Sequence, residues 1–152
     1  MRRFTDTTGR DWHLVLTIGS AAAVKSALGV DLLAPEAGDP PLLQRLAQDD
    51  LLLGSVIAEL LTGQMTERKM TAADVSAAFD GQTMAAASEA FYAELVDFFQ
   101  SRGRRERARM VSRTQELMAK AQAMALAQIE AVQIPGLPSG DSPGSSPVTP
   151  PA

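Results

Sequence analysis

The chain has 152 residues, of which 45% are hydrophobic, 21% charged and 5% aromatic, a composition close to that of average globular proteins apart from the few aromatics. This length provides for one domain of about 100 to 130 residues and leaves no room for a second. The net charge of −4 argues against a general affinity for nucleic acid, and the absence of cysteine excludes disulfides, thiolate zinc sites and thiol nucleophiles.

The first segment predicts a β-hairpin. Apolar residues alternate with mostly polar ones from Trp12 to Ile18, which is the period of a half-buried strand. The turn sequence TDTTGR precedes this strand, and Gly9 can take the left-handed conformation of a short loop, so the partner strand is Arg2–Thr5. Because an isolated hairpin is only marginally stable in water, we expect Trp12 to point inward onto helices further along the chain.

The apolar run at residues 14–24 also resembles the core of a signal peptide. Acidic residues interrupt the basic leader, however, and Lys25 ends the run well short of the roughly 20 residues that a membrane span requires. We therefore interpret the run as a strand followed by a helix, and expect a cytoplasmic protein without a membrane partner.

Helical periodicity and capping residues predict five helices between the hairpin and residue 101. They are 21–29, with Ser20 as N-cap and Gly29 at the end; 42–48, after Pro41; 51–62, capped by Asp49 or Asp50; 72–79, with a capping box from Thr71 to Asp74; and 84–101, capped by Asp80 or Thr83. The polar stretch TGQMTERKM is predicted to be a connector.

Two of these helices are predicted to supply most of the core. Their apolar residues recur at helical spacing: Leu52, Leu53, Val56, Ile57, Leu60 and Leu61 in the first, and Met84, Phe91, Leu95, Phe98 and Phe99 in the second. We expect the second helix to pack on Trp12, with Tyr92, Glu89, Glu94 and Asp97 on its other side.

A long amphipathic helix is predicted after Gly103. Residues 104–132 contain neither Pro nor Gly, and a continuous helix over this range is about 43 Å long. A compact domain of this size has a diameter of roughly 30 to 35 Å, so the end of the helix should extend beyond it. One side of the helix is apolar.

This apolar side carries the predicted partner-binding residues, namely Met110, Val111, Leu117, Met118 and Met124. The first half of the stripe could equally pack on the chain's own core. For the second half, the length of the helix favours a separate protein or a second copy of this chain, and methionine suits such irregular apolar surfaces.

The last residues, 133–152, hold six of the nine prolines and predict a disordered tail. The sequence therefore predicts a mainly α protein in three parts. A hairpin and a small helical core occupy 1–101, a long amphipathic helix occupies 102–132, and a disordered Pro-rich tail occupies 133–152.

The sequence predicts no enzyme, no metal site and no cofactor. His13 is the only histidine, and no second histidine or cysteine could complete a catalytic relay or a zinc site with it. Asp49 and Asp50 are adjacent, which suits a helix cap better than a pair of carboxylates facing one substrate. The glycines are isolated and form no phosphate-binding loop.

The segment Arg102–Arg113 is the basic exception in an acidic chain. Residues 1–101 contain 7 Lys/Arg and 14 Asp/Glu, whereas 102–120 contain 7 and 2. Three interpretations remain open: a solvated start of the helix that pairs with Glu89, Glu94 and Asp97, a surface for a protein partner, and a nucleic-acid interface. The acidic body and the lack of interleaved aromatic residues weigh against nucleic acid.

The order of features resembles a known family. FTDTTGRDWHL, AAAVKSALGVDLL, LLLGSVIAELL and FYAELVDFF, followed by a basic helix, are similar to the tail assembly chaperones encoded among tailed-phage and prophage tail genes. The resemblance covers roughly residues 4 to 110. It implies a non-enzymatic protein that binds the apolar, helical tape-measure protein, and keeps it soluble until tail-tube subunits polymerise around it.

We therefore expect a phage tail assembly chaperone that binds a tape-measure or tail-tube protein by reversible burial of an apolar helix face. One alternative is a small nucleic-acid-binding regulator that uses the Arg102–Arg113 block. A second is a structural component of the virion. A homo-oligomer is compatible with all three.

Overall fold

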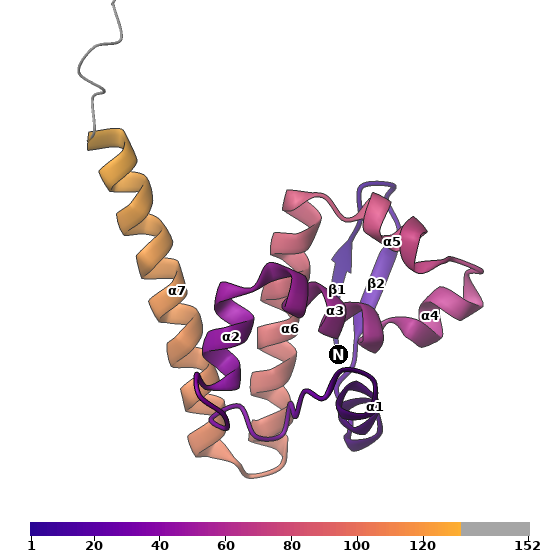
Figure 1. Cartoon of the computed structure of the whole chain (residues 1–152), viewed down its shortest axis with the longest axis horizontal. Helices are drawn as coiled ribbons and strands as arrows, with labels where there is room; N and C mark the ends of the chain where they lie inside the picture. The colour runs from indigo at the N-terminus through magenta and orange to yellow at the C-terminus, as the bar shows by residue number, and fades with distance from the viewer. Residues whose placement is uncertain (132–152) are drawn as a thin grey trace, which may run out of the picture. The chain divides into compact units, whose positions relative to one another are not determined.

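The computed structural model describes residues 1–131, and over this range the chain is mainly helical, with an N-terminal hairpin and a long C-terminal helix (Figure 1). The elements are β1 (Arg2–Thr5), β2 (Asp11–Leu14), α1 (Ile18–Leu28), α2 (Leu42–Gln48), α3 (Asp50–Leu60), α4 (Thr62–Glu67), α5 (Ala72–Ala78), α6 (Gly81–Ser101) and α7 (Arg105–Ala131). The predicted fold class is thus confirmed. The predicted tail, 133–152, lies outside the described residues.

The chain divides into two units, Met1–Ala119 and Lys120–Ala152, and the boundary falls within α7. The first unit contains the hairpin, helices α1 to α6 and the beginning of α7. All side chains described as buried belong to this first unit, and the last of them in the sequence is Val111.

The hairpin loop is organised by the buried carboxylate of Asp6. Its Oδ1 accepts hydrogen bonds from the Thr8 N–H (2.9 Å), the Thr8 hydroxyl (2.7 Å) and the Arg10 N–H (3.1 Å). Its Oδ2 accepts one from Trp12 Nε1 at 2.9 Å. Gly9 has the left-handed φ of +80° that the loop requires, as predicted.

The inner face of the hairpin lies on the helices. Phe4 pairs with Trp12 across the two antiparallel strands, and both side chains are buried. Both rings meet Phe79 edge-on, with centroid separations of 5.5 Å for Phe4 and 6.0 Å for Trp12. Trp12 therefore points inward as predicted, and Phe79, just before α6, supplies the aromatic contact.

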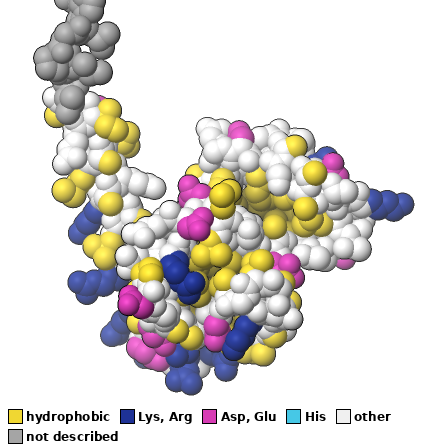
Figure 2. All heavy atoms as spheres, in the orientation of Figure 1, with side chains coloured by type: hydrophobic (Ala, Val, Ile, Leu, Met, Phe, Trp, Pro, Cys, Tyr) yellow, Lys and Arg dark blue, Asp and Glu magenta, His cyan; other side chains and the backbone are white. Residues whose placement is uncertain are grey.

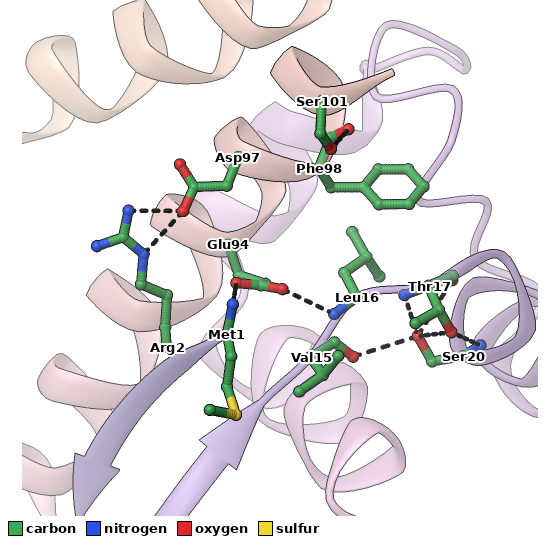
Figure 3. Close-up of polar contacts among 10 residues, drawn as sticks. All are labelled: Met1, Arg2, Val15, Leu16, Thr17, Ser20, Glu94, Asp97, Phe98 and Ser101. Atoms are coloured by element: carbon green, nitrogen blue, oxygen red, sulfur yellow. Dashed lines mark hydrogen bonds and ion pairs between the residues drawn. The ribbon is translucent and has the colours of Figure 1, made fainter.

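Polar contacts join the open end of the hairpin to the second half of α6 (Figure 3). The guanidinium of Arg2 donates to Asp97 Oδ2 at 2.7 and 3.1 Å. Glu94 Oε1 accepts from the Leu16 N–H at 3.0 Å, and Glu94 Oε2 lies 2.9 Å from the amino group of Met1. One of the three interpretations of the basic block included its pairing with Glu94 and Asp97. The structure does not show that pairing, because the start of the chain occupies both carboxylates.

The boundary between strand and helix differs from the prediction. Ile18 was expected on the buried strand face, but it begins α1 and its side chain is 51% exposed. Thr17 is the N-cap, and the predicted cap, Ser20, is its partner in a capping box. The reciprocal bonds of that box start the helix three residues early, whereas its end at Gly29 is as predicted.

The stretch predicted as a connector contains helix α4. Leu61 is fully buried and serves both as C-cap of α3 and as N-cap of α4. From α4, the Gln64 amide donates to the His13 carbonyl at 2.6 Å and accepts from the His13 N–H at 3.0 Å. These tertiary contacts stabilise a helical turn that the local polarity does not predict.

The core lies between α3 and α6, which are in contact with each other, while α1 and α2 pack on α3. Leu53, Val56 and Ile57 of α3 are buried, and Asp49 caps this helix through the N–H groups of Leu51 and Leu52. Asp80, one of the two predicted caps, begins α6 by accepting from the Thr83 N–H.

The far side of α6 is less exposed than predicted. Tyr92 and Glu94 were expected on its outer surface, but both are buried. Burial raises the pKa of the Tyr92 hydroxyl to about 12, and the negative charge of Asp50 adds to the shift. The period of one apolar face does not show which other sides of a helix are covered. The start of the chain covers Glu94, and Tyr92 lies close enough to Asp50 of α3 to sense its charge.

Candidate protein-binding face of helix α7

Helix α7 follows a sharp joint at Gly103, whose φ of +72° places it in the left-handed region. The first turns of α7 are fixed to the core. Ala108 and Val111 are 2% and 0% exposed, and Arg107 donates to the Leu33 carbonyl at 2.6 Å and to Glu36 at 2.8 Å. This inner face holds the beginning of α7 in place.

The five predicted partner-binding residues fall on two different sides of α7. Met110, Leu117 and Met124 are 38%, 58% and 65% exposed. Val111, in contrast, is fully buried in the core, and Met118 is half-buried against it. Three of the five side chains are therefore accessible to a partner, and the other two serve the chain's own packing at least in part.

Two exposed apolar side chains of α7 were missing from the predicted set. Leu126 and Ile129 are 60% and 69% exposed. At 100° per residue, Leu126 lies on the opposite side of the helix from Leu117, so a search for a single stripe passes over it. Composition is the signal that could have found both. Between Lys120 and the end of α7, Glu130 is the only charged residue, so apolar side chains lie on all sides of the helix there.

The surface of α7 thus combines large apolar side chains with basic ones. Figure 2 shows both kinds on this helix. Exposed side chains of this size are normal when scattered singly, and it is a contiguous apolar patch that points to an interaction site.

The basic block at the start of α7 is partly engaged by the chain itself. Arg102 lies over the Phe98 ring at 5.5 Å, Arg104 is 4.0 Å from Glu106, and Arg107 is anchored as described above. Arg105 and Arg109 line a pocket of about 400 Å³. The block is therefore less free than its composition predicts.

No protein-family model, curated protein or solved structure matches this chain. The resemblance to tail assembly chaperones thus stays a prediction. Within residues 1–131, no helix is long and apolar enough to cross a membrane.

Asp6 and His13 are both engaged in contacts within the first unit. Burial by itself would raise the pKa of the Asp6 carboxyl, but the hydrogen bonds from Thr8, Trp12 and Arg10 outweigh it and lower the pKa to about 2. His13 is held through its backbone by Gln64, and its buried Nδ1 has no partner among residues 1–131. That range also contains no group of three His, Asp or Glu side chains suited to a metal ion.

Proposed function

We propose that this protein is a non-enzymatic assembly factor of the tail assembly chaperone type. It would hold a long apolar helical client, such as a tape-measure protein, in soluble form until tail-tube subunits assemble around that client. The observation that supports this function is the set of large apolar side chains exposed on α7, chiefly Met110, Leu117 and Met124.

Burial of these side chains supplies the binding free energy. Each large apolar side chain that passes from water into an interface contributes about 1.5 to 3 kcal/mol, before the costs of association are subtracted. A few such contacts give binding that is firm yet reversible, as a chaperone needs. The thioether of methionine adapts to client surfaces that differ in shape.

This function needs no cofactor and no bond-making step. Its setting is the cytoplasm of the host cell, where a newly made client would otherwise aggregate through its apolar surface. The recognition mode is a helix face that covers a matching apolar stripe on the client.

Co-expression with a tape-measure protein tests the proposal. The wild-type chain should raise the soluble fraction of that client, and the double variant Leu117→Glu/Met124→Glu should lose the effect because it places two charges in the interface. The matched control is Arg105→Glu/Arg109→Glu, which also introduces two glutamates on α7 and should retain the effect. Circular dichroism verifies that both variants are folded.

A folded Leu117→Glu/Met124→Glu protein that still keeps the client soluble would contradict the proposal. If the same variant unfolds instead, the apolar side belongs to the chain's own core, which also contradicts it.

Nucleic-acid binding is the second candidate, and the exposed cationic side chains of Arg105 and Arg109 near the start of α7 favour it. Such binding should appear in a gel shift and weaken steeply with salt, because phosphate contacts release counterions. In that case Arg105→Glu/Arg109→Glu removes the activity, and the apolar variant keeps it. The third reading, a structural virion component, requires that the protein be retained in purified particles.

A further inference from the structure

The exposed side of α7 contains a heptad seam. Larger side chains stand seven residues apart, and smaller ones fill the positions between them, in alternating steps of four and three. The seam consists of Met110, Thr114, Leu117, Ala121 and Met124. This is the spacing of the contact residues in one helix of a coiled coil, and the small residues allow a second helix to approach closely.

The seam is separate from the face that packs on the core. At 100° per residue, Val111 is rotated by roughly 100° from Met110, and Ala108 by roughly 160°. Val111 and Ala108 are buried, whereas Met110 and Leu117 are 38% and 58% exposed, and all four belong to the first unit. The seam therefore has no covering helix within that unit.

Thr114, the polar residue of the seam, already has a hydrogen-bond partner within the helix. Thr114 is half-buried, and its hydroxyl donates to the Met110 carbonyl at 3.0 Å within the helix. A partner that covers Thr114 would leave no unpaired donor in an apolar interface, so this position does not oppose docking.

Charge distinguishes the two flanks of the seam. Arg113 and Lys120 are seven residues apart on one flank, both are exposed, and neither forms an ion pair with another residue in 1–131. The corresponding positions on the other flank are Val111, Met118 and Ala125, which are apolar. A helix lying on the seam would thus meet positive charge on one side only.

We propose that the seam binds an amphipathic helix of another protein, whose apolar stripe is bordered by Glu or Asp on the flank that faces Arg113 and Lys120. The inference rests on the proposed function and specifies the client segment that α7 recognises. Flanking pairs of opposite charge select partner and orientation in coiled coils, and here they would align the client helix along α7.

A second copy of this chain fits the seam poorly. In an antiparallel pair, the flank with Arg113 and Lys120 faces the same flank of its copy, so like charges meet. In a parallel pair, these cations face Met118 and Ala125, which offer no carboxylate. Neither arrangement supplies the acidic groups that the flank lacks.

Fluorescence anisotropy of the full chain with two labelled synthetic helices tests the inference. Both peptides carry the same three-heptad leucine and alanine stripe, and one has Glu and the other Lys at the flanking positions. The Glu peptide should bind roughly tenfold more tightly at low salt, and the preference should shrink in high salt as the charges are screened.

Charge reversal supplies the decisive comparison. Arg113→Glu/Lys120→Glu should transfer the preference to the Lys peptide. The control Arg104→Glu/Arg105→Glu makes the same change in net charge at two exposed positions that point away from the seam, and should leave the Glu peptide preferred. Leu117→Glu should weaken the binding of both peptides at least tenfold.

The outcomes separate this inference from the proposed function. If Leu117→Glu abolishes binding but charge reversal changes nothing, apolar docking stands and the acidic partner is overturned. If neither peptide binds, or a folded Leu117→Glu protein binds both as the wild type does, the seam fails together with the proposed function. If sedimentation shows a dimer that Leu117→Glu dissociates, a second copy occupies the seam and the inference is overturned.

Discussion

Asp6 is the residue on which the hairpin depends most. Its two carboxylate oxygens accept four hydrogen bonds, including that of the buried Trp12 indole, which could not reach water if Asp6 were absent. Because the folded state holds its pKa near 2, below the ordinary 3.8, the ionised form of Asp6 stabilises the fold.

Replacing Asp6 with Ala should lower the free energy of unfolding by about 2 to 3 kcal/mol, since it leaves the Trp12 Nε1–H buried without an acceptor and frees the loop N–H groups. Urea unfolding followed by Trp12 fluorescence measures the change. Asp11→Ala is the control on the exposed side of the hairpin, and an equal loss there would contradict the role given to Asp6.

The stability contributed by Asp6 should depend on pH with a defined sign. A carboxyl whose pKa is depressed on folding contributes fully above its unfolded pKa, near 3.8, and loses the contribution as the pH falls toward 2. Asp6→Asn should therefore be less stable than the wild type at pH 6, and the difference should narrow below pH 3. A gap that stays constant over this range would be inconsistent with the lowered pKa.

At the scale of elements, α7 has two apolar sides with different surroundings. Val111 faces the core and Leu117 faces away from it, although both are apolar and lie within two turns of each other. Sequence periodicity predicted the helix and most of its large apolar residues, though not Leu126 and Ile129, because period and length are local properties. It could not divide those residues into an inner and an outer set, because the division depends on where α7 lies against the other helices of the first unit.

Alanine substitutions should separate the two sides of α7. Val111→Ala removes buried methyl groups and should cost roughly 2 kcal/mol of unfolding free energy, whereas Leu117→Ala should cost less than about 0.5 kcal/mol. Chemical denaturation of the two variants measures both values. Equal costs would mean that Leu117 also packs on the core.

Helix α4 shows the opposite limit of sequence reasoning. Its residues are polar and carry few helical signals, so the segment was predicted as a connector. Contacts with the distant hairpin stabilise it instead: Gln64 binds the His13 backbone, and Arg68, just after the helix, donates to the Asp11 carbonyl and lies over the Trp12 ring. Capping boxes, in contrast, are local, and the one at Thr71 was predicted correctly.

Gln64→Ala should therefore destabilise the protein by about 1 to 2 kcal/mol, because it removes both hydrogen bonds to the β2 backbone. Hydrogen exchange should show faster opening at the His13 amide than in the wild type. Gln64→Glu keeps the acceptor for the His13 N–H but turns a carboxylate oxygen toward the His13 carbonyl, so it should destabilise the protein at least as much as Gln64→Ala. Unchanged exchange in both variants would rule out this bridge as a stabilising contact.

For the whole molecule, the proposed binding surface, apart from Met110, follows Val111, the last residue described as buried. No residue after Val111 in the described range is buried, while four of the large exposed apolar side chains lie between residues 117 and 129. Folding of the first unit and binding by α7 can therefore be separated by mutation.

A chain ending at residue 119 should keep the melting temperature of the full protein within about 2 °C, because no buried side chain is lost. The same truncation should remove most of the client-solubilising activity, since the last two positions of the seam, Ala121 and Met124, are absent. Calorimetry and the co-expression assay measure the two effects. A large fall in melting temperature would show that residues after 119 stabilise the first unit.

The lack of cysteine also makes α7 a convenient place for a reporter. Ala123 is exposed and lies outside the seam. Ala123→Cys would therefore create the sole thiol in the chain without changing the seam or the side of α7 that packs on the core. A dye attached there would sit close to any helix that docks on α7. Its emission could follow the arrival and release of a client in real time, in the intact protein and without labelling the client.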